Sequence, residues 1–550
     1  MFHKYRGRAA MVAAGLLSLT LAFTSACSSG EEEKKGEDLS AVSVGAMAKY
    51  GVGDQFKATE ALSFEVLYNN HPNYPLNDAW LFWKELTART NVTLKPIAVP
   101  LSDYEQKRGL LIGAGDAPFI IPKTYPGQES AYVASGAILA VSDYIDLMPN
   151  FKEKLNKWGV DDNVNGLKQE DGKFYVLPGI HEKPWLDYSI AVRTDILEQL
   201  KLPVPKTWDD VYTMLKAMKA AYPDSIPFSD RFSKPTPVGN LMNIVGTAYS
   251  APGGWGYQHV NWNEQAKKFE FAGATEGYKG MLQYLAKLVK EGLLDPESFT
   301  QDDAQARQKL ANGKSFVIST NAQSIVNDYR PDLAKTIPNA KIAKIPTPTG
   351  PAGDIVPGTS QLENGVMITR KARDSKNFVA MMQFIDWLFY SEKGMEFAKW
   401  GVEGVTYTKD ASGKRTLAKD VNFIGLNPTG TKHLQKDFGF QNGVFTYGGT
   451  SELLQSTFSA EEQEFQKVLN ARKVLPVPPP KPFNDEEREM ATLWETPLKD
   501  YVTQQSLRFI LGQRDFGEWD AYLNELKAKN MTQYVDMVNK AYDRFKKAHG

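Results

Sequence analysis

Hydrophobic and polar positions alternate with two different periods through the first part of the chain. Residues 63–68 (SFEVLY) alternate with a period of two, which predicts a β-strand, and residues 92–97 and 119–121 predict two more. Residues 78–87 (DAWLFWKELT) place apolar side chains at helical spacing behind Asp78, a candidate N-cap, and another helix follows the second strand. This β-α-β-α-β order predicts an α/β fold with a mostly parallel sheet and helices on both faces.

Proline and glycine then indicate where the chain leaves this first unit. Residues 172–177 and 189–192 predict two strands, and the connection between them carries two prolines and a glycine. We expect the chain to cross there, near 179–188, from one lobe to another, with further crossings near 319–323 and 368–374. The hinge between two lobes would lie at these crossings.

The remaining pattern is strands and helices in the middle of the chain and mainly helices afterwards. Thr207 followed by Asp210 predicts a helix start close to a capping box, and Val474–Pro482 (VLPVPPPKP) predicts a polyproline-type linker. The other predicted segments are strands at 316–319, 342–345 and 365–368 and helices at 278–292, 484–511 and 517–548.

The N-terminus has the pattern of an export signal. Three basic residues precede an apolar run over residues 9–23, which is shorter than the roughly 20 residues needed to span a bilayer. Residues 24–27 (TSAC) end in Cys27, the only cysteine of the chain, and resemble the bacterial lipobox, with Thr24 where that pattern prefers leucine. The resemblance implies that residues 1–26 are a lipoprotein signal peptide and that Cys27 carries a diacylglycerol, whose two acyl chains suffice for stable anchoring.

The charge and the length of the chain limit the partners and the number of lobes that we expect. Removing residues 1–26 takes the formal charge from −1 to −4, which argues against nucleic acid as a partner. Residues 28–40 are polar and lack aromatics, and we expect a disordered tether over 27–58. About 520 mature residues exceed one ordinary core. The predicted division is an N-terminal α/β lobe at 59–183 plus 322–372 and a C-terminal lobe at 184–321 plus 373–550 with a helical extension.

Three motifs resemble known metal or nucleotide sites, but each lacks one essential residue. Residues 161–166 (DDNVNG) begin like an EF-hand loop, but its twelfth position is Gly172 instead of glutamate. Residues 312–315 (NGKS) end like a P-loop, but Gln308 stands where the first glycine is required. A zinc-protease motif starting at histidine 181 would need a second histidine at Trp185. We therefore expect no cofactor, no metal site and no catalytic residue.

Several segments in chain order resemble the maltose-binding-protein type of extracellular solute-binding protein, and the last two resemble the ending of large Gram-positive lipoproteins for polysaccharide uptake. The segments are DGKFYVLP (171–178), YSIAVRTDILEQLKLPVPKTWDD (188–210), YLAKLVKEGLLDPESFT (284–300), LANGKSFV (310–317), FIDWLFYSEKGMEFAKWGVEG (384–404), FILGQRDFGEWDAYLNELKAKNM (509–531) and AYDRF (541–545). The resemblance implies a periplasmic-binding-protein-like fold of two lobes with ligand bound between them. Large members often carry a calcium loop, but here residues 220–227 offer only Asp224, and calcium takes six to eight oxygens.

Aromatic residues beside glycine or proline in loops are the candidate ligand contacts. Trp255 and Tyr257 lie in a Gly-rich stretch, Trp185 lies in the first crossing, and Trp400 precedes a glycine loop that contains Glu403. An aromatic face matches the C–H face of a pyranose, while polar neighbours bond its hydroxyls. The alternative is that each ring packs its loop onto a lobe. Three other tryptophans lie at helical spacing and are predicted to be core: Trp80, Trp83 and Trp387.

Together these features predict a lipid-anchored protein on the outer face of the cell membrane. By resemblance it captures an oligosaccharide and delivers it to the permease subunits of an ABC importer, acting as a monomer. The alternative is an exported carbohydrate-active enzyme, because 65 acidic residues guarantee some close carboxylate pair. Spacing along the chain selects no such pair.

Overall fold

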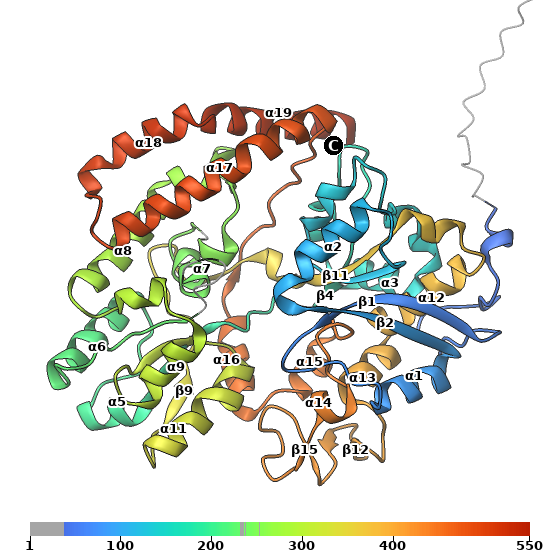
Figure 1. The fold of residues 1–550 in the computed structure, drawn as a ribbon, viewed down its shortest axis with the longest axis horizontal. Helices are drawn as coiled ribbons and strands as arrows, with labels where there is room; N and C mark the ends of the chain where they lie inside the picture. The colour runs from blue at the N-terminus through green and yellow to red at the C-terminus, as the bar shows by residue number, and fades with distance from the viewer. Residues whose placement is uncertain (1–37, 232–235, 237, 252, 550) are drawn as a thin grey trace, which may run out of the picture. The chain divides into compact units, whose positions relative to one another are not determined.

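The computed structural model describes residues 38–231, 236, 238–251 and 253–549, and two larger β-sheets in this part carry their own helices (Figure 1). The first sheet has the strand order β2-β1-β3-β11-β4. Its strands are β1 (Leu62–Asn70), β2 (Val92–Pro100), β3 (Ile120–Thr124), β4 (Leu177–Ile180) and β11 (Leu362–Ile368). β1 is parallel to β2 and β3, whereas β11 is antiparallel to β3 and β4. The α/β class is confirmed, and the sheet is mixed instead of mostly parallel.

The helices around the first sheet come from distant parts of the chain. α12 (Phe378–Tyr390) is buried along its whole length, because nearly all its side chains are apolar, and Phe384 meets Phe64 of β1. Trp80 and Trp387 are buried as predicted, while Trp83 is half-buried. The other helices here are α1 (Leu81–Thr90), α2 (Tyr104–Gly113), α3 (Pro149–Trp158), α4 (Asp161–Asn165), α13 (Glu392–Trp400), α14 (Leu434–Phe438) and α15 (Ser451–Ser456).

The second sheet is smaller and antiparallel. Its order is β8-β5-β9, formed by β5 (Ser189–Arg193), β8 (Val317–Thr320) and β9 (Ile342–Lys344). The predicted helix start is confirmed, because Thr207 and Asp210 form both bonds of a capping box. The helices here are α5 (Thr194–Leu200), α6 (Trp208–Ala221), α7 (Gly239–Thr247), α8 (Glu276–Lys290), α9 (Asp303–Ala311), α10 (Ala322–Ser324) and α11 (Arg330–Thr336), with a π-helical turn at Ile325–Tyr329.

The C-terminal extension is helical, as predicted. It contains α17 (Asp485–Ile510), α18 (Trp519–Ala528) and α19 (Met531–His549), and α16 (Ala460–Asn470) precedes it in the chain. α17 lies beside α8 (Figure 1), where the Tyr278 hydroxyl and Ser506 Oγ are 3.0 Å apart. Its apolar residues share one hydrophobic core with the second sheet, so the extension belongs to that body. Short strand pairs complete the fold: β6 (Val260–Asn263) with β7 (Lys268–Phe271), β10 (Ile355–Val356) with β16 (Lys473–Val474), β12 (Tyr407–Lys409) with β13 (Arg415–Leu417), and β14 (Val421–Asn422) with β15 (Lys432–His433).

The chain passes between the two sheets at one expected and two unexpected places. The first crossing, residues 181–188, joins β4 to β5 as predicted. The second lies at 345–361 instead of 319–323, because β8 leads through α10 and α11 to β9, which pairs with β5. The third follows α15 at 457–484 instead of 368–374, because β11 leads to α12 on the first sheet. Residues 342–344, predicted in the first lobe, therefore join the second sheet, and α12, predicted in the second lobe, packs on the first sheet. β11 in the first sheet and the last three helices beside the second sheet lie where they were predicted.

Two more local predictions differ from the structure. Residues 41–58, assigned to a disordered tether, pack on α12, where the Met47 N–H donates to Gln383 Oε1 and the Tyr50 hydroxyl donates to Asp386 Oδ2. The apolar side chain of Phe56, fully buried, is the physical reason. The strand predicted at 172–177 begins only at Leu177. The signal peptide and Cys27 lie outside the described residues.

Candidate functional site

The first crossing runs beside the second, and hydrogen bonds hold the two together. The His181 N–H donates to the Gln361 carbonyl at 2.9 Å, and the Trp185 N–H donates to the Ser360 carbonyl at 3.2 Å. The crossing ends at Tyr188, directly before β5. Tyr188 is therefore placed at the junction of the two sheets by the connection itself.

The loop after α7 brings Trp255 to Tyr188. The two rings meet edge to face with centroids 5.5 Å apart. This approach depends on Gly239 at the start of α7, where a Cβ would stand 2.4 Å from Trp255 Cδ1, and on Gly254, which has a φ of +55°. The Trp255 side chain remains 39% exposed. We call the first sheet with its helices the first lobe, and the second sheet with its helices the second lobe. A glycine-rich sequence thus presents an indole at the surface of the second lobe.

Tyr125 presents a second aromatic ring from the first lobe. It follows β3 directly, and its backbone exchanges hydrogen bonds with Gln128. Tyr125 is 51% exposed, and Tyr125 and Trp255 are the two most exposed aromatic residues that the structure describes. Burial, with smaller contributions from Glu363 and Glu105, nevertheless raises the pKa of the Tyr125 hydroxyl to about 12.

Electrostatics connects Tyr188 with groups from both lobes. The pKa of its hydroxyl is raised to about 12, mainly by burial and also by Asp187 and Tyr125, while Asn321 and Arg231 act to lower it. We call Tyr125, Tyr188 and Trp255 the aromatic group. Charged and amide side chains beside such rings are the hydrogen-bonding partners that sugar hydroxyls require.

Arg231 contributes a cation from the second lobe. It is 5% exposed, donates from Nη2 to Ser324 Oγ at 3.0 Å, and lies 5.5 Å from the centre of the Tyr329 ring. Ser324 and Tyr329 belong to α10 and the π-helical turn that follow Asn321. π-helical turns occur often at functional sites.

Trp185 lies in a different environment from the aromatic group. It is half-buried, with its ring centre 5.1 Å from that of His181 and 6.5 Å from that of Phe458. In the described part of the chain, its indole Nε1 is buried without a hydrogen-bond partner. It lines a small cavity beside the first crossing with His181, Gly449, Gln455, Phe458, Gln466 and Asn470, among others.

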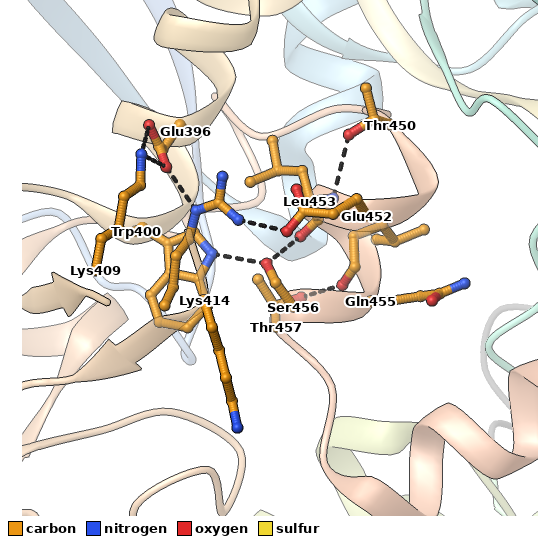
Figure 2. Close-up of polar contacts among 12 residues, drawn as sticks. Glu396, Trp400, Lys409, Lys414, Thr450, Glu452, Leu453, Gln455, Ser456 and Thr457 are labelled. Atoms are coloured by element: carbon orange, nitrogen blue, oxygen red, sulfur yellow. Dashed lines mark hydrogen bonds and ion pairs between the residues drawn. The ribbon is translucent and has the colours of Figure 1, made fainter. Parts of the chain in front are cut away.

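Tyr257 and Trp400 pack inside the protein, in contrast to the predicted ligand contacts. Tyr257 packs against the core of the second lobe, with its ring 6.1 Å from that of Tyr278. Trp400 is 2% exposed, and Figure 2 shows its indole N–H donating to Ser456 Oγ at 3.0 Å. The Trp400 ring fills core space, which leaves it little surface for a ligand, whereas Tyr257 is half-buried against the core.

Glu403 is exposed, but it lies beside β12 and not beside the aromatic group. Its backbone bridges to Tyr407, and that strand leads to Lys409, which pairs with Glu396 of α13 (Figure 2). Trp255, by contrast, follows α7 in the second lobe. The structure therefore brings Trp255 and Tyr188 together, and it separates both from Trp400 and Glu403.

Sequence reasoning missed Tyr125, Tyr188, Asn321 and Arg231. Tyr125 carries the signal that selected Trp255, because Pro126 and Gly127 follow it in a loop directly after a buried strand. Tyr188 was within the predicted crossing. Nothing local distinguishes Asn321 or Arg231, which meet Tyr188 only through the folded chain.

Two negative findings concern the described residues alone. No group of three or more His, Cys, Asp or Glu side chains there could hold a metal ion. No helix in the same residues has the length and apolar character of a membrane span. What the arrangement offers chemically is aromatic faces with nearby hydrogen-bonding groups.

Comparison with known sequences gives a family match and two informative relatives. Residues 78–395 match the model for bacterial extracellular solute-binding proteins. The polygalacturonan/rhamnogalacturonan-binding protein of Bacillus subtilis (strain 168) is 27% identical over 333 residues, which cover 59% of this chain and 63% of that protein. The fructooligosaccharide ABC transporter substrate-binding protein of Streptococcus pneumoniae serotype 4 is 24% identical over 476 residues, which cover 81% of this chain and 83% of that protein.

Solved structures share the fold. A crystal structure of an alginate-binding protein without calcium ion aligns with a TM-score of 0.67 at 21% identity, covering 89% of this chain and 99% of that one. The S. pneumoniae substrate-binding protein in complex with kestose aligns with a TM-score of 0.62 at 20% identity, covering 88% and 100%. At these identities the likeness establishes the two-lobe α/β architecture.

Proposed function

The chain belongs to the bacterial extracellular solute-binding protein family, and from this premise we propose that it binds an oligosaccharide and delivers it to an ABC importer. The observation that carries the proposal is the aromatic group. Its two exposed rings, Tyr125 and Trp255, come from different lobes; Trp255 contacts the Tyr188 ring, and Tyr125 raises the pKa of the Tyr188 hydroxyl. A sugar stacked there would contact both lobes and favour their closed arrangement.

The ligand class follows from the chemistry of these side chains. Indole and phenol faces cover the C–H faces of sugar rings, while Arg231, Asn321 and Asp187 supply donors and acceptors for hydroxyls. The two relatives reported above are named for polygalacturonan or rhamnogalacturonan and for fructooligosaccharide. We propose a non-catalytic role, in which the sugar leaves unchanged.

The rest of the proposal concerns organisation and location. We propose a first lobe of residues 41–180 plus 362–456 and a second lobe of residues 189–344 plus 485–549, joined by the three crossings. We also propose that the protein is a monomer held at the outer face of the membrane by the lipid on Cys27, where it meets the permease subunits. Of the five residues predicted as ligand contacts, Trp255 is part of the proposed site, and Trp185 lies in the first crossing beside a separate small cavity.

A thermal-shift screen against pectic, fructan and other oligosaccharides tests this function. A ligand that binds the folded state raises the melting temperature by mass action. We expect at least one oligosaccharide to raise it and to be recovered intact from the mixture. A sugar that is cleaved during the assay would instead support the carbohydrate-active enzyme.

A further inference from the structure

One buried lysine joins all three crossings. Lys344 ends β9 and begins the second crossing, and only 2% of its side chain is exposed. Its Nζ donates to the Asp187 carbonyl at 2.6 Å and lies 3.3 Å from Asp187 Oδ1 in the first crossing. It also lies 2.6 Å from Glu462 Oε2 in α16, which belongs to the third crossing.

The same contacts reach the aromatic group. Asp187 Oδ1 also accepts the Ala322 N–H at 2.9 Å. Asp187 and Ala322 directly adjoin Tyr188 and Asn321, whose side chains are hydrogen-bonded to each other. A displacement of Asp187 would therefore move two residues of the proposed sugar site.

The third crossing is attached through α16. Gln466 Nε2 donates to the Leu186 carbonyl at 2.8 Å and to Glu462 Oε1 at 2.9 Å. On the same helix, Glu461 pairs with Arg330 of α11 at 2.5 Å. Glu462 thus faces Lys344 and Asp187 directly, while the charge of its neighbour Glu461 is directed to another element.

Two carboxylates sharing one buried ammonium leave an excess negative charge in a poorly solvated place. The pKa of Glu462 is raised to about 7, because burial and the charge of Asp187 together outweigh the lowering effect of Lys344. Glu462 therefore changes charge near neutral pH, well above the ordinary range of glutamate. When Glu462 takes up a proton, Lys344 loses one of its two carboxylate partners and keeps Asp187.

We propose that Lys344 is a positioning residue that fixes the three crossings relative to one another, and that protonation of Glu462 releases α16 from it and widens the range of lobe arrangements. The link to sugar binding rests on the proposed function, since it acts through Tyr188 and Asn321. The link between the crossings does not depend on any ligand.

The test measures the distance between the lobes in ligand-free protein. With Cys27→Ser the chain has no other cysteine, so Leu110→Cys on α2 and Val204→Cys in the second lobe, 63% and 48% exposed, accept spin labels uniquely. We expect a narrow distance distribution at pH 8 and a broader one at pH 5.5. Glu462→Gln should give the broad distribution at both pH values, and the matched control Glu461→Gln should behave like the unmodified protein.

The outcomes are separable. The role of Lys344 and Glu462 would be overturned by either of two results. One is a distance distribution in the unmodified protein that does not change between pH 8 and pH 5.5, and the other is a distribution in Glu462→Gln that stays narrow at pH 8. Should Glu462→Gln unfold, Lys344→Met, which removes the ammonium instead, must give the broad distribution at pH 8. Adding kestose as a probe to the unmodified protein tests sugar-driven closure, and a failure there would count against the ligand proposal while the pH response would stand on its own.

Discussion

The Trp255 indole meets the Tyr188 ring edge to face, with centroids 5.5 Å apart and an interplanar angle of 79°. Tyr188 ends the first crossing, and Trp255 stands in a loop of the second lobe. This contact holds the indole beside Tyr188, while Trp255 stays 39% exposed and so keeps surface available for stacking. The position of Trp255 is thereby tied to the connection between the lobes.

Gly239→Ala is expected to displace Trp255 without unfolding the protein. The new methyl group would stand 2.4 Å from the indole, so the ring must move away from α7. We expect sugar affinity to fall by about tenfold, since a 1.4 kcal/mol loss corresponds to that factor. Calorimetric titration with a sugar from the thermal screen measures this. Gly113→Ala, a helical glycine with open space around it, is the control and should leave affinity unchanged.

Trp400→Ala should affect stability and leave binding alone. The side chain is buried and its indole N–H donates to Ser456 Oγ, so truncation leaves a cavity and removes this hydrogen bond, while the Ser456 hydroxyl keeps its bond to the Leu453 carbonyl. Large aromatic truncations in cores cost about 3–5 kcal/mol of unfolding free energy. Urea denaturation measures this loss. If sugar affinity dropped while stability remained, Trp400 would be a ligand contact, as the sequence had suggested.

Glu129→Gln should change how stability depends on pH. Burial raises the pKa of Glu129 to about 7, above the ordinary value, so the folded protein binds this proton more tightly than the unfolded chain does. The contribution of Glu129 to stability is therefore full in acid and is lost as pH rises from about 4.5 to 7. We expect Glu129→Gln to melt higher than the unmodified protein at pH 8 and equally at pH 4.5. Glu489→Gln, an exposed change on α17, should show no such pH-dependent gain.

Cys27→Ala should release the protein from the membrane fraction and abolish labelling with a fatty acid. Cys27 is the only cysteine, so no other thiol can take the lipid. Fractionation of cells that express both forms checks this. A variant that stayed membrane-bound and labelled would show that the anchor lies elsewhere.

Local signals predicted local structure well. The period-two pattern gave β1 and β2 within a few residues, and the Thr207–Asp210 capping box formed as expected. The second and third crossings could not be found this way, because the pairing of β9 with β5 is a contact between segments distant in sequence. A strand's period does not say which sheet it joins.

The difference between local signals and contacts made only in the folded chain also applies to the candidate site. Glycine beside an aromatic ring indicated both Trp255 and Trp400 as ligand contacts, and the structure leaves Trp255 exposed but buries Trp400. There Gly401, with a φ of +90°, ends α13 and packs against Phe440 and Thr406, so the glycine serves a close approach instead of an open loop. Whether a glycine opens a surface or closes a core depends on neighbours that only the fold supplies.

Calorimetric titration of Trp255→Ala tests the central claim most directly, with the oligosaccharide that raises the melting temperature of the unmodified protein. Losing a large aromatic contact at an interface commonly costs ~2 kcal/mol or more. We expect affinity to fall at least about tenfold while the melting temperature without ligand stays nearly unchanged, and Tyr125→Ala to act in the same direction. Trp158→Ala, a half-buried tryptophan at the end of α3, is the matched control and should retain full affinity. Unaltered affinity in Trp255→Ala together with a large loss of stability would contradict the account, because Trp255 would then be a packing residue.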